Sequence, residues 1–140
     1  PNTTLFRSLW ANDSVWLNPV TKAFDEGTTR KLIKLEDGTN GVLVTYSSGG
    51  VTPGDSYLWL LAMDGIPRAW RMWGKIVPVG GVEFEWKNWI KLPGGALIAL
   101  DRDGLFDVNI TELRAAFTLE ELFPGKDPFA ELVALKTASR

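Results

Sequence analysis

Apolar side chains occupy successive positions, rather than alternate ones, along residues 57–63. A strand here would carry large apolar groups on both faces, with Tyr57, Trp59, Leu61 and Met63 on one and Leu58, Leu60 and Ala62 on the other. A strand that is apolar on both faces is usually central, with both faces covered or facing a partner. The segment therefore predicts a central strand around which the rest of the chain is arranged.

The dipeptide Asp64-Gly65 follows this strand. It is typical of a type I′ hairpin turn, because both central residues of that turn need a positive φ, which Asp tolerates and Gly adopts freely. The chain should therefore return as residues 66–77. Pro67 disfavours a central position for the returning strand, since proline has no N–H to donate to a ladder.

Short alternating segments elsewhere predict further strands. They cover residues 5–10, 14–17, 31–35, 42–46, 82–86, 96–100 and 105–108. Turn residues at 11–13, 36–41 and 101–104 predict the hairpin connections between neighbouring pairs. Residues 18–30 are polar and irregular, which predicts a long surface loop or contact arm.

The C-terminal part of the chain changes its pattern near Asn109. Asn109 with Glu112, and Thr118 with Glu121, are capping pairs that predict helices over 110–117 and 119–123. A third helix is predicted from Pro128 to about residue 138, with an apolar stripe of Phe129, Leu132 and Val133. This helix is expected to dock on the strands of its own chain or on a neighbouring subunit.

The predicted fold is one mainly β domain over residues 1–140, or α+β by a strict count of elements. We expect an antiparallel β-barrel or β-sandwich of about eight to ten short strands. The strand-and-turn body covers residues 1–108 and the helical tail residues 109–140. A chain of 140 residues is long enough to bury one sizeable core without metal or disulfide support.

The composition excludes several kinds of chemistry. The chain has no cysteine and no histidine. Disulfide frameworks, Cys/His zinc sites and nucleophiles activated by histidine are therefore excluded. No segment approaches the ~18 to 20 apolar residues of a membrane span, so we expect a soluble protein, located in the cytoplasm or in a virus particle. We predict no enzymatic activity, no catalytic residues, no metal and no cofactor.

Two carboxylate patterns were candidates for chemistry. Glu83 and Glu85 alternate with Val82, Phe84 and Trp86, which resembles the paired acids of glycosidases but also fits a half-buried strand with a solvated face. Four acids match positions 1, 3, 7 and 12 of an EF-hand calcium loop, but Leu105 takes a ligand position and Phe106 replaces the required glycine. These four acids are Asp101, Asp103, Asp107 and Glu112. The sequence leaves open whether they bind a cation.

Charge is unevenly distributed along the chain. Residues 66–92 hold five basic and two acidic side chains, and residues 101–131 hold three basic and eight acidic ones. The opposite charges could pair between copies of the molecule or within one copy. In the basic segment, cations and indoles interleave, and we predict that six of these residues bind a partner. They are Arg68, Trp70, Arg71, Trp73, Lys75 and Trp89.

Three functions remain open. The first is a non-enzymatic structural or assembly protein, such as a phage capsid or tail component. It would contact copies of itself or other subunits through residues 68–75, the loop 18–30 and the C-terminal helix. The second is a carbohydrate-binding module, in which some of the seven tryptophans stack on sugars. The third is single-stranded nucleic acid binding by residues 68–91, which the net charge of −2 disfavours. The first is our prediction.

Overall fold

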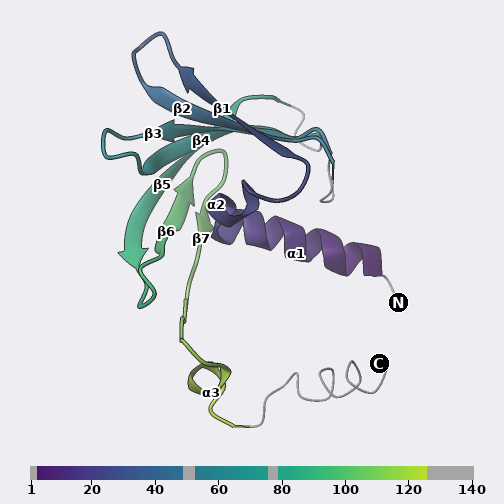
Figure 1. The fold of residues 1–140 in the computed structure, drawn as a ribbon, viewed down its shortest axis with the longest axis vertical. Coiled ribbons are helices and arrows are strands. Elements are labelled where there is room, and N and C mark those ends of the chain that lie inside the picture. Colours follow the sequence, from purple (N-terminus) through teal and green to yellow (C-terminus); the bar gives the residue numbers. More distant parts are fainter. Residues whose placement is uncertain (1–2, 49–52, 76–78, 126–140) are drawn as a thin grey trace.

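The protein is one antiparallel sheet preceded by a helix (Figure 1). The computed structural model describes residues 3–48, 53–75 and 79–125, with side chains from residue 9 onward. Two helices, α1 (Thr3–Leu17) and α2 (Pro19–Lys22), come first, and the short helix α3 (Leu119–Leu122) lies after the sheet. The strands are β1 (Thr28–Lys34), β2 (Asn40–Tyr46), β3 (Ser56–Leu61), β4 (Pro67–Trp73), β5 (Val82–Lys91), β6 (Leu97–Asp103) and β7 (Val108–Asn109).

The strands pair in sequence order from β1 to β7, each antiparallel to the next. The predicted mainly β, antiparallel fold is confirmed, and β3 lies inside the sheet as predicted. Pro67 is the first residue of β4, a place where the missing N–H costs little. Within the described residues β1 and β7 are the two edges and do not pair with each other. A closed barrel or a sandwich therefore stays a prediction.

The β3–β4 hairpin lies where it was predicted, but its turn is not type I′. Gly65 has a φ of 83°, whereas Asp64 is not among the residues with positive φ. The Ala62 N–H donates to the Ile66 carbonyl (2.8 Å) and the Gly65 N–H to the Ala62 carbonyl (3.0 Å). In this turn Gly65 is the residue that takes the left-handed conformation. The Asp64 carboxylate accepts a hydrogen bond from the Ile66 N–H at 3.0 Å.

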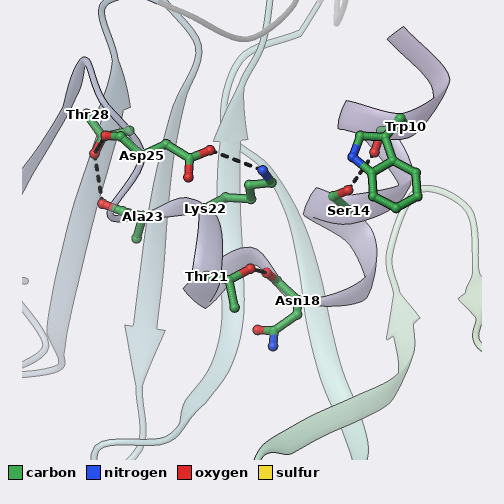
Figure 2. Close-up of polar contacts among 8 residues, drawn as sticks. All are labelled: Trp10, Ser14, Asn18, Thr21, Lys22, Ala23, Asp25 and Thr28. Carbon is green, nitrogen blue, oxygen red and sulfur yellow. Dashed lines mark hydrogen bonds and ion pairs between the residues drawn. The ribbon is translucent and has the colours of Figure 1, made fainter. Parts of the chain in front are cut away.

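The N-terminal strands predicted at 5–10 and 14–17 are wrong, because residues 3–17 form α1. Polar residues at 11–14 favoured a turn, but the Ser14 hydroxyl donates to the Trp10 carbonyl (2.6 Å) inside the helix, as Figure 2 shows. The predicted loop 18–30 contains α2, with Pro19 at its start, and ends in β1.

The predicted helix over 110–117 is also wrong. Glu112 has a φ of 54°, which a right-handed helix does not contain. By contrast, α3 begins after Thr118, whose hydroxyl accepts the Glu121 N–H at 3.3 Å, so that cap was predicted correctly. The third predicted helix, over 128–138, lies outside the described residues.

The last hairpin turns later than predicted. Asp101, Arg102 and Asp103 belong to β6, and the chain reverses over residues 104–107. A Cβ on Gly104 would lie 2.6 Å from the backbone oxygen of Glu83 and 2.5 Å from Cδ1 of Phe84. Glycine at this position therefore lets the turn pass close to β5.

Side chains pack on both faces of the sheet, as the pattern of residues 57–63 predicted. The larger cluster lies on the face that α1 and α2 approach (Figure 1), and its buried members are Ala23, Val44, Trp59, Trp70, Phe84, Trp86 and Ala99. The smaller cluster, on the opposite face, consists of Leu58, Leu60 and Ala69, with Ile33, Leu35 and Leu43 beside them. None of the described helices is long and apolar enough to cross a membrane.

Candidate functional site

Three features stand out: a buried arginine beneath α1, a face of ion pairs, and exposed apolar side chains at both ends of the chain.

Of the charged residues that the structure describes, Arg102 lies deepest in the core. Its side chain is 1% exposed, and its guanidinium lies 4.7 Å from the centre of the Trp86 ring. Nη1 donates to the carbonyls of Ala99 (2.7 Å) and Asp101 (3.2 Å), and Nη2 donates to the Trp16 carbonyl (3.2 Å).

The Trp16 carbonyl lies in the last turn of α1, where helix carbonyls lack partners within the helix and the helix dipole is negative. Arg102 therefore supplies a hydrogen bond and a complementary charge to the end of α1. Burial lowers the pKa of Arg102 to about 10, opposed by the charge of Asp101, so it remains charged at neutral pH. The sequence showed only Asp-Arg-Asp beside a glycine, which looks like a solvated turn.

Aromatic rings join α1 to the same face. The centroid of the Trp16 ring lies 5.2 Å from those of Trp70 and Phe84, and 6.0 Å from that of Phe106 in the last turn. Trp70 has no exposed surface and also packs against Tyr57 and Trp86. It is a core residue in this structure and is not available to a surface partner.

The other five predicted partner residues are not brought together in one surface. Arg68 and Lys75 are exposed, and Trp73 is 41% exposed. Trp89 is half-buried against Trp86 (5.8 Å between ring centroids). Trp86 and Trp89 are three residues apart, and in a regular strand such residues point to opposite faces. Asn88, with a φ of 52°, interrupts the alternation between them, so both indoles lie in the same cluster.

Acids and bases pair across the outer face of the sheet. The Arg71 Nε lies 2.7 Å from Glu83 Oε2, and the Lys87 Nζ lies 2.8 Å from both Glu85 Oε2 and Asp103 Oδ2. These hydrogen bonds, first to Asp103 and then to Glu85, raise the pKa of Lys87. The predicted opposite charges are therefore matched in part within one copy.

The carboxylate candidates have other partners in the structure. Glu83 and Glu85 are the acids of the ion pairs just described, and the Asp101 carboxylate accepts a hydrogen bond from the Asn88 amide. Among the described residues no group of three or more acidic side chains is placed to hold a metal ion. The geometry therefore adds no support to a glycosidase or calcium site.

Large apolar side chains are exposed at both ends of the described chain. The N-terminal apolar surface, carried by α1, α2 and the residues after them, consists of Leu9, Trp10, Leu17, Val20 and Phe24. Trp10 is 73% exposed. The tail, defined as residues 105–125, exposes Leu105, Phe106, Phe117, Leu119 and Phe123. Large apolar patches on a protein surface often mark interaction sites. The sequence had named the loop 18–30, which includes Val20 and Phe24, as a contact region. The other exposed apolar side chains were not singled out, because an apolar pattern does not say whether its face is covered.

Comparison with models of protein families, with curated proteins and with solved structures found no match.

Two half-buried tyrosines, Tyr46 and Tyr57, are expected to make the folded state less stable at alkaline pH. Burial raises the pKa of Tyr46 to about 12, with a smaller effect of Asp25. Burial, followed by the charges of Asp55 and Tyr46, also raises the pKa of Tyr57. Unfolded phenols titrate near pH 10, so above that pH the unfolded state binds fewer protons than the folded state. The contribution is complete below pH 10 and is lost as pH rises through the folded pKa values.

We therefore expect the free energy of unfolding to fall above pH 10, by up to about 1.4 kcal/mol per pH unit for each tyrosine. Tyr57→Phe should fall less steeply than the parent when urea unfolding is followed at pH 9, 10 and 11. The difference between the two proteins isolates this phenol from other groups, including Arg102. Equal slopes for parent and variant would contradict the prediction.

Proposed function

We propose that this protein is a non-enzymatic assembly subunit that acts through protein–protein contacts, as a component of a repeating structure such as a phage capsid or tail. The observation that carries the proposal is the exposure of large apolar side chains on the N-terminal apolar surface and on the tail. Isolated domains seldom expose so many large apolar groups in two segments, because each one loses the hydrophobic gain of burial.

The chemistry of the chain supports a binding role over a catalytic one. Cysteine and histidine are absent, and Glu83, Glu85 and Asp103 already form ion pairs within the chain. An enzyme would need another acid, base or metal site with its groups in mutual reach. A binding subunit needs only complementary surface, which α1 and the tail offer.

The test is the native mass of the full chain at micromolar concentration, by light scattering on a sizing column in low and high salt. We expect species heavier than the 15.5 kDa chain. The variant Leu9→Ser with Trp10→Ser should shift the mass toward the monomer without lowering the unfolding temperature, because both side chains are exposed. Met63→Ser, at an exposed position in the β3–β4 turn, is the control. A parent protein that stays monomeric would argue against self-assembly.

Carbohydrate binding is the second candidate, and Trp73 favours it. A Cβ on Gly80 would lie 2.6 Å from Cδ1 of Trp73, so the backbone packs against this indole while 41% of the residue stays exposed. Ser56 lies directly opposite Trp73, and its hydroxyl is 3.0 Å from that of Thr45. An indole beside hydroxyl groups suits a sugar ring. Quenching of tryptophan fluorescence by oligosaccharides in the parent, and not in Trp73→Ala, would support this function.

Nucleic acid binding receives less support. Arg71 and Lys87, two of the basic residues that were expected to follow phosphates, pair with carboxylates of the same chain. Their charge is thus partly neutralised on the surface where a strand would bind.

A further inference from the structure

The two edges of the sheet differ in charge and in what covers them. The first edge strand, β1, contains three basic residues and no acidic one, and its outer side is paired with no strand of the described chain. The tail contains the other edge strand, β7, and runs on beyond it, with four acidic residues and one basic residue over 105–125. An open edge strand is a template for another chain.

From this arrangement we propose that copies of the protein join head to tail, with the acidic tail of one copy lying along the basic β1 edge of the next. The inference rests on the proposed assembly function and names its partner and polarity. Each copy would offer one edge and one tail, so the contact would be heterologous and would build a ring or an open chain.

The tail leaves its own sheet after a short anchored start. Phe106 packs against Phe84 (5.0 Å between ring centroids), and the Ile110 N–H donates to the Leu100 carbonyl at 2.8 Å. Within the described residues, 111–117 form no backbone hydrogen bond to another segment. Phe117 is 75% exposed, and Figure 1 shows this stretch running away from the sheet. The tail is therefore placed to contact a neighbour.

Within one copy the tail and β1 belong to opposite edges of the sheet. Six strand-to-strand steps of about 4.8 Å separate β7 from β1 along the sheet, or roughly 29 Å. Figure 1 shows β1 at one end of the molecule and α3 at the other. A second copy can present its β1 edge directly to the tail, whereas the same copy would have to fold the tail back across the sheet.

Charge decides between a head-to-tail contact and a symmetric pairing of two β1 strands. Lys31 and Lys34 are exposed on β1, and two such strands side by side would bring like charges together, which is destabilising. The tail offers Glu112 and Glu120 as exposed opposite charges. It also offers Phe117 and Leu119 to apolar groups near the edge. Those groups are Leu32 and Phe24, each 72% exposed.

The experiment reverses the charges. The edge variant carries Lys31→Glu and Lys34→Glu, the tail variant carries Glu112→Lys and Glu120→Lys, and a fourfold variant carries all of them. Lys87→Glu with Lys91→Glu is the control, with the same charge change as the edge variant at exposed residues of β5. Self-association is measured by sedimentation equilibrium in low salt, after thermal unfolding has shown that each variant folds.

We expect the edge and tail variants each to weaken self-association by at least about tenfold, and the control to weaken it less. A one-to-one mixture of the two variants, and the fourfold variant alone, should recover association, because every contact is again between opposite charges. A parent that remains monomeric would overturn both this inference and self-assembly. If the parent associates but the edge variant and the control lose the same amount of self-association, only the head-to-tail contact would be overturned.

Cross-linking gives a second, independent readout, since the chain has no cysteine of its own. A copy with Lys34→Cys mixed with a copy with Glu120→Cys should form the mixed disulfide dimer under mild oxidation. Dimers made only between two Lys34→Cys copies would indicate β1–β1 pairing and would overturn the proposal. A monomer cross-linked to itself, in a chain carrying both substitutions at high dilution, would indicate a tail folded onto its own β1 and would overturn it as well.

Discussion

Arg102→Met is expected to lower the free energy of unfolding by about 3 kcal/mol. Methionine fills much of the same volume but leaves the carbonyls of Trp16 and Ala99 without their donor. A buried polar group that loses its partner costs about 1–3 kcal/mol. The gain from no longer burying a charge offsets part of this loss. Urea unfolding, followed by tryptophan fluorescence, measures the difference.

The loss of stability in Arg102→Met should be greatest where α1 packs on the sheet. Amide hydrogen exchange is expected to show that α1 loses protection in Arg102→Met while β3 and β4 keep theirs, because the arginine links β6 to the end of that helix. Arg102→Lys should give an intermediate result, since an ammonium keeps the charge without the planar fork. Arg68→Met, at an exposed position, is the control. A variant Arg102→Met as stable as the parent would mean that the arginine contributes no net stability.

Trp70→Leu is expected to cost about 3–5 kcal/mol, the usual range for removing a large buried side chain. Trp70 has no exposed surface and contacts rings from β3, β5 and α1. No leucine side chain can fill the space of an indole among these neighbours. The same measurement of urea unfolding applies, and Trp70→Phe should lose less because an aromatic ring remains.

Trp73→Leu is the matched control for this prediction. The two tryptophans lie three residues apart in β4, but Trp73 is 41% exposed, so its replacement should cost about 1 kcal/mol or less. If both variants lose the same stability, the division of β4 into a core residue and a surface residue is wrong. If Trp73→Leu changes ligand binding without changing stability, the exposed indole belongs to a binding surface.

The strands were predictable where local patterns carry the information. The hairpin over residues 31–46 and the return after Gly65 were found because glycine supplies the positive φ that a tight turn needs. Alternation around Phe84 and Trp86 gave the correct buried face of β5. The type of the β3–β4 turn was missed, since Asp-Gly suits both a two-residue turn and a longer one with a single left-handed glycine.

The N-terminal helix was not predictable in the same way. Trp16 and the end of α1 are stabilised by Trp70, Phe84 and Arg102, all more than fifty residues away in sequence. A helix held by such contacts can contain a polar run such as residues 11–14, which local propensity assigns to a turn. The burial of Trp70 was missed for a related reason, because nearness in sequence does not separate core from surface side chains.

By itself, the sequence determined the antiparallel strand-and-turn character of the chain and the absence of histidine and cysteine chemistry. These properties are local, since they depend on alternation, on glycines in turns and on residue types. Only the tertiary structure decided that α1 is a helix, that Arg102 lies beneath it, and that Trp70 is buried while Trp10 is exposed. Burial and charge partners depend on which distant segments meet, and contacts between them outweigh the small differences in local propensity.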